Sequence, residues 1–126
     1  MSETQLLTTL TWTFTAPCPI PSDVESMLAP GEMPHYAFKT IRDVAIFTNK
    51  RLIVRDAQGI TGKKVEIYSL TYTSIVMYST ENAGKVLDVN SEIEIWTLIG
   101  KIKVLLNKNI DIRQFDTILA TAILNR

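Results

Sequence analysis

Basic residues around a glycine-containing loop are the side chains of this chain best suited to chemistry. Lys50 and Arg51 lie in a turn, and Lys63 and Lys64 follow a Gly-Ile-Thr-Gly run at 59–62. Glycines let the backbone approach an anion closely, and the cations supply the opposite charge. The four residues are therefore a candidate site for a small anion such as a nucleotide or a phosphorylated metabolite. The simpler interpretation is that the glycines satisfy turn dihedrals while the lysines keep the loop soluble.

The glycine spacing is not that of a nucleotide-binding P-loop. A Walker loop has four residues between its glycines and runs into a helix, whereas this loop has two and the sequence predicts a strand after it.

The sequence contains few residues that could act in catalysis or bind a metal ion. The single histidine is His35, and the single cysteine is Cys18, which lies between two prolines. Nothing near either residue indicates an activated nucleophile and base. One histidine and one cysteine cannot form a structural zinc site, and the acidic residues lack EF-hand spacing. We therefore expect no catalytic residues, no metal site, no cofactor and no enzymatic activity.

Charge is separated along the chain although the net charge is zero. Residues 39–64 hold seven basic and two acidic residues, a net +5, and residues 66–94 hold one basic and five acidic residues, a net −4. Two faces of opposite sign would suit head-to-tail self-association. The alternative is two ordinary solvated faces. The candidate contact residues for self-association are Arg42, Glu81, Asp88, Glu92 and Glu94.

Length and composition favour one cytoplasmic domain. The chain has 126 residues, 46% of them hydrophobic, and no apolar run approaches the ~20 residues that cross a bilayer. The N-terminus lacks the basic region of a secretory signal, and a lone cysteine is typical of a reducing compartment. Zero net charge disfavours nucleic-acid binding and makes membrane binding an unlikely function.

The element pattern is mostly β with a C-terminal helix. Residues 8–15 alternate apolar and threonine side chains, which predicts a half-buried strand ended by the prolines that follow. Ser22 and Glu25 have capping-box spacing and predict a short helix stopped by Pro30-Gly31. Asp111 and Gln114 repeat that spacing before an amphipathic helix. Seven further strands are predicted at 35–42, 44–48, 51–56, 64–70, 74–80, 90–99 and 101–107.

Three stretches resemble the bacterial pleckstrin-homology (PH) domain family, and the resemblance covers about residues 31–124. They are Phe38-Lys-Thr-Ile-Arg-Asp43, Phe47-Thr-Asn-Lys-Arg-Leu-Ile53 and Asp56-Ala-Gln-Gly-Ile-Thr-Gly-Lys-Lys-Val-Glu66. The resemblance implies a partly open barrel of two antiparallel sheets, with seven strands, closed by the C-terminal helix. It also implies ring-shaped homo-oligomers, often five-fold, and no established enzymatic activity.

These observations lead to one domain and two functional hypotheses. Residues 31–126 form the PH-like unit, and residues 1–30 add an extra N-terminal strand and a short helix. That strand is expected to pair with its own sheet, although pairing with a neighbour is the alternative. The leading hypothesis is a non-catalytic, ring-forming scaffold or binding module that presents one surface several times to a protein partner. The alternative is capture of a small anionic ligand at a subunit interface by Lys50, Arg51, Lys63 and Lys64.

Overall fold

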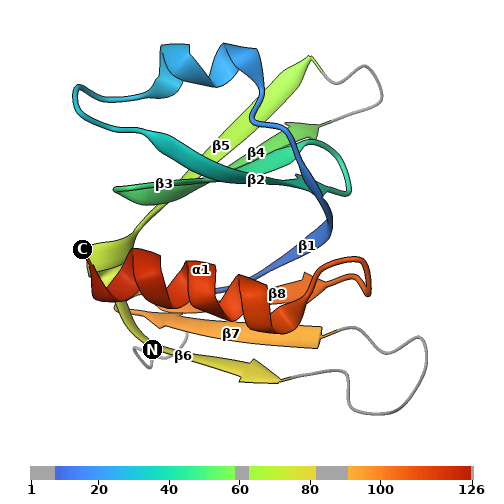
Figure 1. Ribbon diagram of the computed structural model, residues 1–126, viewed down its shortest axis with the longest axis vertical. Helices are drawn as coiled ribbons and strands as arrows, with labels where there is room; N and C mark the ends of the chain where they lie inside the picture. Colours follow the sequence, from blue (N-terminus) through green and yellow to red (C-terminus); the bar gives the residue numbers. More distant parts are fainter. Residues whose placement is uncertain (1–7, 59–62, 82–90, 126) are drawn as a thin grey trace, which may run out of the picture.

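A computed structural model describes residues 8–58, 63–81 and 91–125 (Figure 1). The described elements follow in the order β1 (Thr8–Cys18), η2 (Ser22–Met27), β2 (Pro34–Thr40), β3 (Val44–Thr48), β4 (Arg51–Gln58), β5 (Lys64–Thr71), η3 (Tyr72–Ser74), β6 (Ile75–Glu81), β7 (Ser91–Thr97), β8 (Gly100–Leu106) and α1 (Ile112–Leu124). The mostly β fold with a C-terminal helix is confirmed, and each predicted strand lies within three residues of its observed bounds.

The eight described strands form one hydrogen-bonded sheet rather than two. Their order is β5-β4-β3-β2-β1-β8-β7-β6, and the sheet does not close, because β5 and β6 stand at its two ends. Strand β1 joins the halves: it pairs antiparallel with β2 and parallel with β8. Figure 1 shows β1 running from the lower half, β6–β8, to the upper half, β2–β5. The first strand is therefore central to the domain and not an addition at its margin.

The alternating sequence of β1 explains its central place. Trp12 and Phe14 are buried on the core side, while the neighbouring Thr11 and Thr13 are more exposed. The strand continues three residues beyond the predicted end, with Pro17 opposite Phe38 and Cys18 opposite Ala37. The expectation that it pairs with its own sheet is confirmed.

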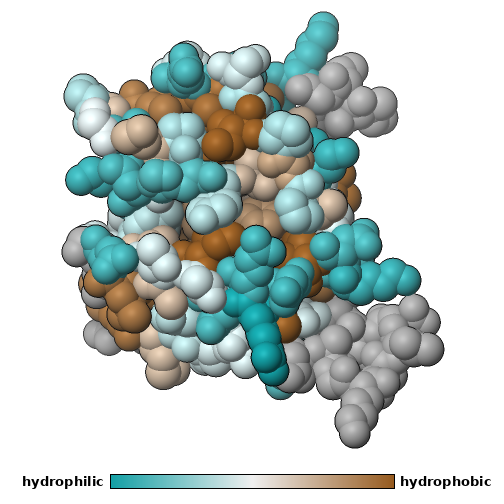
Figure 2. All heavy atoms as spheres, viewed as in Figure 1, coloured by the Kyte–Doolittle hydropathy of each residue, from teal (hydrophilic) through white to brown (hydrophobic). Residues whose placement is uncertain are grey.

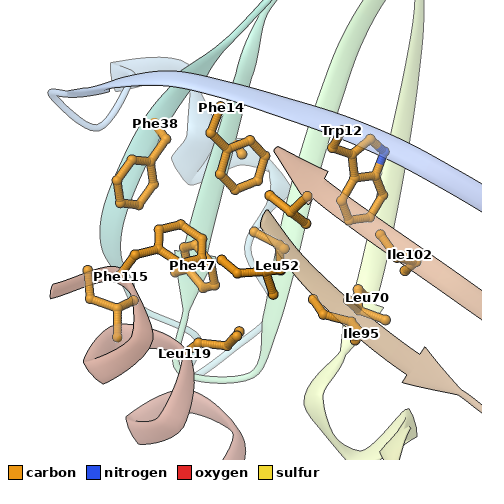
Figure 3. Close-up of a cluster of buried hydrophobic side chains, with 14 of the residues drawn as sticks. Trp12, Phe14, Phe38, Phe47, Leu52, Leu70, Ile95, Ile102, Phe115 and Leu119 are labelled. Atoms are coloured by element: carbon orange, nitrogen blue, oxygen red, sulfur yellow. The ribbon is translucent and has the colours of Figure 1, made fainter. Parts of the chain in front are cut away.

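Four phenylalanines form the centre of the main core (Figure 3). Phe14, Phe38, Phe47 and Phe115 have ring centroids 5.3–6.0 Å apart in five contacting pairs. Aromatic pairs at this separation contribute beyond the area they bury. Because Phe115 belongs to α1, the same contacts hold the helix against the core side of the sheet.

Helix α1 packs as its sequence predicts, and of its predicted capping box only the Asp111 cap is formed within the described residues. The Asp111 carboxylate accepts a hydrogen bond from the Arg113 amide at 3.0 Å, which caps the first turn. The helix then buries one apolar face against the core: Phe115, Ile118, Leu119 and Ile123.

The predicted capping box at Ser22 and Glu25 is wrong. Pro21 takes the N-cap position, no side chain caps the segment, and the six residues form a 3-10 helix, η2. The Val24 amide donates to the Pro21 carbonyl at 3.2 Å, and Val24 is buried. Its side chain belongs to a second, smaller core with Ala37, Val44, Ile46 and Ile53. Packing of Val24 on the sheet therefore positions this segment.

The sequence predicts that Pro30-Gly31 stops the short helix, but η2 ends earlier, at Met27, and these two residues form a tight turn. The Glu32 amide donates to the Ala29 carbonyl at 3.0 Å, and Gly31 has a φ of 78°. This is the left-handed conformation that glycine adopts at the third position of a type II turn, after proline. The turn carries Glu32 from the end of η2 to the β3–β4 hairpin.

Candidate functional site

Arg51, one of the predicted anion ligands, forms an ion pair with a buried carboxylate. Its Nε donates to Oε2 of Glu32 at 2.8 Å, and its Nη2 donates to Oε1 at 3.0 Å. The Glu32 side chain is 1% exposed and that of Arg51 is 23% exposed. Two parallel hydrogen bonds of this kind give both strength and fixed geometry.

Both members of this pair make further hydrogen bonds. The Ala29 amide and the Thr48 hydroxyl donate to Glu32, at 2.9 and 2.7 Å. Arg51 also donates to the Met27 carbonyl at 2.7 Å and the Ser69 hydroxyl at 2.8 Å. The Arg51 hydrogen bonds, more than any other contact, lower the pKa of Glu32 to about 2. The guanidinium thus ties η2 and β5 to the hairpin, and is engaged within the fold.

Other charged side chains of the basic and acidic segments also pair within the chain. Arg55 contacts Asp43 at 3.0 Å and Asp23 at 2.9 Å, and Arg42 contacts Asp56 at 3.1 Å. On the other half of the sheet, two lysines of β8 pair with glutamates of β7: Lys101 with Glu94 at 2.6 Å, and Lys103 with Glu92 at 3.8 Å.

The predicted anion ligands do not converge within one chain. Lys50 precedes β4 at the β3–β4 hairpin, whereas Lys64 pairs with Gln58 at the opposite end of β4. A strand rises about 3.3 Å per residue, so the eight residues of β4 place the two ends roughly 23 Å apart. Lys63 adjoins Lys64, and the glycine run at 59–62 lies outside the described residues.

The predicted self-association residues occupy several places on the fold. Arg42 lies in the β2–β3 turn, Glu92 and Glu94 lie on β7, and Glu81 ends β6 opposite Glu92. Asp88 lies outside the described residues. The structure thus places three of the acidic residues on neighbouring strands and Arg42 on the other half of the sheet.

A groove between α1 and β2 is a concave feature that sequence reasoning missed. One section, about 390 Å³, lies between the end of β1, β2 and the start of α1, and includes Cys18 and Gln114. The next, about 230 Å³, runs toward the end of α1 at Asn125. His35, Tyr36 and Ile118 line both sections, so the two sections adjoin. On the face shown in Figure 2, hydrophobic surface lies among hydrophilic side chains.

A β-bulge exposes His35 in this groove. Pro34 is opposite Thr48 and Tyr36 is opposite Phe47, so His35 is the extra residue between two successive pairs. Bulges of this kind redirect a side chain and interrupt the regular ladder. Only the bulge, invisible in the sequence, distinguishes His35 from an ordinary strand residue.

A second apolar cleft lies between β1, β5 and the turn that joins β7 to β8. It has a volume of about 410 Å³, and Trp12, Tyr68, Leu70 and Ile102 are among its lining residues. Leu98 and Ile99 at its rim are 76% and 77% exposed.

The end strands of the sheet combine a free edge with exposed apolar side chains. Val65 and Ile67 on β5 are 48% and 47% exposed, and Val76 and Met77 on β6 are 62% and 54% exposed. Each strand is paired on one side only within the described residues. An unpaired edge is a template for strand addition by another chain.

The described residues contain no group of histidine, cysteine, aspartate and glutamate side chains that could hold a metal ion. Cys18 is half-buried, and burial raises the pKa of its thiol, which disfavours the reactive thiolate. No helix in the described part of the chain has the length and apolarity to span a membrane.

Comparison with known proteins places this geometry among bacterial PH domains. The profile described as "Bacterial PH domain" matches residues 7–123. A crystal structure of a DUF1696 family protein with a pleckstrin-homology domain from Shewanella loihica PV-4 is 30% identical, with a TM-score of 0.78 over 86% of this chain and 96% of that one. A pleckstrin homology domain from Shewanella amazonensis SB2B is 32% identical, with a TM-score of 0.67 over 81% of this chain and 83% of that one.

A curated relative is closer in sequence over a shorter stretch. The uncharacterized protein YjqA of Bacillus subtilis (strain 168) is 47% identical over 77 residues, which are 61% of this chain and 61% of that protein. The match thus spans less than two thirds of the relative's length.

Proposed function

Because the chain belongs to the bacterial PH domain family, we propose that it is a non-catalytic binding module that assembles with copies of itself into a closed ring. The observation that carries the proposal is the open sheet. Strands β5 and β6 end it on opposite sides, and both expose apolar side chains next to an edge that no other described strand pairs with. A cytoplasmic location and a function without catalysis are parts of the same proposal.

The ring would form by pairing β5 of one copy with β6 of the next. The two edges are different surfaces, so their contact is heterologous and generates a ring when the rotation between copies closes. The carbonyls and amides of each edge would complete the ladder, while Val65, Ile67, Val76 and Met77 bury apolar area across the junction. A closed ring would repeat one binding surface several times and so increase the avidity for a multivalent partner.

The internal ion pairs indicate that apolar packing and backbone pairing, rather than charge, would drive assembly. Arg42, Glu92 and Glu94, three of the residues predicted to join copies, each have a partner within their own chain. Exposed pairs of this kind contribute little, and a second partner would compete with the first.

Capture of a small anion is the less supported function. Within one chain the site could use Lys63 and Lys64 but not Lys50, because Lys50 lies at the opposite end of β4. Arg51 could not contribute either, because its guanidinium pairs with Glu32. A subunit interface that brings Lys50 of one copy beside Lys64 of another would be required.

Native mass spectrometry of three variants tests the ring. A lysine on an edge strand blocks edge-to-edge pairing. We expect Ile67→Lys on β5 and Val76→Lys on β6 each to convert the closed oligomer of the parent protein to a monomer. Ile41→Lys is the matched control, since Ile41 is 74% exposed but lies in the β2–β3 turn; we expect it to leave the oligomer intact.

Mixing the two edge variants separates head-to-tail pairing from a symmetric contact. An equimolar mixture of Ile67→Lys and Val76→Lys retains one compatible pair of edges, so we expect a heterodimer and nothing larger. A symmetric β5–β5 contact would instead give homodimers of Val76→Lys alone. That result, or a monomeric parent protein, would refute the proposed ring.

A further inference from the structure

The groove between α1 and β2 has a free backbone edge along one side. The pairing of β1 with β2 stops at Cys18 opposite Ala37, although β2 continues back to Pro34. Pro19 and Pro21 follow Cys18 and lack the amides that would extend the ladder. Within the described residues, therefore, no strand pairs with positions 34–36 of β2 on the side where β1 has ended.

The space next to that edge is where the β1 path would continue. The first section of the groove is lined by Cys18 and Pro19 at the end of β1 and by Gln114 of α1. His35 and Tyr36 line this section and also the next, which ends at Asn125. One wall of the groove is thus a strand edge and the other is a helix, with apolar side chains such as Ile118 between them.

The length and charge of the groove define what fits it. From Gln114 to Asn125 the helix rises roughly 17 Å, at 1.5 Å per residue. An extended chain covers that distance in about five residues. The two sections contain no lysine or arginine, and their single carboxylate, Asp111, caps α1. A phosphorylated or otherwise anionic ligand would find no lysine or arginine to pair with, whereas an uncharged segment of extended polypeptide needs no such partner.

We infer that this groove binds an extended, uncharged peptide segment of a partner protein, which adds to β2 beyond the end of β1 and packs its alternate side chains against α1. Backbone hydrogen bonds to β2 would supply affinity, and the apolar floor would select β-branched or aromatic residues at every second position. The bulge at His35 would mark where the peptide meets the edge. This inference gives a partner class to the proposed binding module, but its binding step does not require the ring.

A display selection tests the inference. Phage-displayed random heptapeptides would be selected on the full chain carrying Ile67→Lys, which leaves the groove unchanged, and the recovered peptides would be synthesised. We expect uncharged sequences with apolar residues at alternate positions. Thr121→Trp would fill the groove, because Thr121 lines it from the exposed side of α1, and should weaken binding at least tenfold. Leu124→Trp, on the same helix but outside the groove, is the matched control and should retain affinity.

Peptide analogues test the backbone part of the inference. Methylating alternate backbone nitrogens of a selected peptide removes the donors needed for strand addition but keeps its side chains. We expect at least a tenfold loss for one of the two alternating methylation patterns. Equal affinity for both patterns and the parent peptide, recovery of charged sequences, or binding unaffected by Thr121→Trp would overturn the inference. The selection uses the Ile67→Lys variant, whose groove is unchanged. Peptide binding therefore tests the groove independently of the oligomer mass, which tests the ring.

Discussion

Arg51 and Glu32 lie 19 residues apart in the sequence, and in the fold they form a two-point ion pair with N–O distances of 2.8 and 3.0 Å. The pair joins the segment after η2 to the β3–β4 hairpin, and it explains why a residue with the features of an anion ligand has a structural role. A buried pair is destabilising to break, because the remaining charge is left without its partner.

Glu32 should make the protein sensitive to acid. Its pKa falls from 4.5 to about 2 on folding, so the unfolded chain binds the proton more tightly. The stabilisation is fully present above pH 4.5 and is lost as the pH falls through about 2. A shift of this size corresponds to about 3 kcal/mol.

Urea unfolding at pH 7 and between pH 5 and 2 measures this contribution. We expect Glu32→Gln to lower the free energy of unfolding by about 3 kcal/mol at pH 7 and to flatten its pH dependence in the acid range. Glu25→Gln, at an exposed carboxylate of η2, is the control and should follow the parent protein. An unchanged acid profile for Glu32→Gln would show that the pair contributes nothing.

The hydroxyl of Tyr72 also stabilises the β3–β4 hairpin. Tyr72 is buried, and its hydroxyl lies 2.7 Å from the Thr48 carbonyl and 2.8 Å from that of Arg51. Burial, followed by the nearby Glu32 charge, raises its pKa above the ordinary range, so the group stays a donor at physiological pH.

Tyr72→Phe should cost about 1–2 kcal/mol of unfolding free energy, because it removes the side-chain donor to the Thr48 carbonyl, whereas the Arg51 carbonyl still accepts from the Thr48 hydroxyl. Tyr36→Phe removes a hydroxyl from an exposed tyrosine and should change stability little. Equal effects of the two substitutions in thermal or urea unfolding would contradict the assigned role.

Assembly should be insensitive to salt. Raising NaCl from 0.1 to 1 M shortens the Debye length from ~10 to ~3 Å and weakens exposed ion pairs. We expect the oligomer to keep its mass in analytical ultracentrifugation, since Arg42, Glu92 and Glu94 have partners in their own chain. Dissociation in high salt would instead support charge-driven contacts between copies.

Anion binding should be undetectable. Calorimetric titration of the parent protein with inorganic phosphate and with ATP should give no saturable heat, because Lys50 and Lys64 lie at opposite ends of β4. Saturable binding that Lys63→Ala with Lys64→Ala abolishes without changing the oligomer would restore the anion-capture function.

The sequence was sufficient for the elements because their causes are local. The alternation around Trp12 predicts β1, the helical spacing around Phe115 predicts α1, and Asp111 precedes that helix as its cap. Proline and glycine at 30–31 predict that the short helix ends before β2. The resemblance to bacterial PH domains, carried by short stretches of residues 38–66, was also available from the sequence and is confirmed.

The roles of the charged residues and the place where a partner could bind depend on the tertiary structure. Asp23 and Glu32 precede the basic segment 39–64 in the sequence, but in the fold they pair with Arg55 and Arg51 of that segment. Strand β1 joins the two halves of the sheet because β8, some 90 residues later, pairs with it. Ion pairs, parallel pairing and the groove along α1 depend on contacts between distant segments, whereas periodicity and capping report only on a residue's neighbours in the chain.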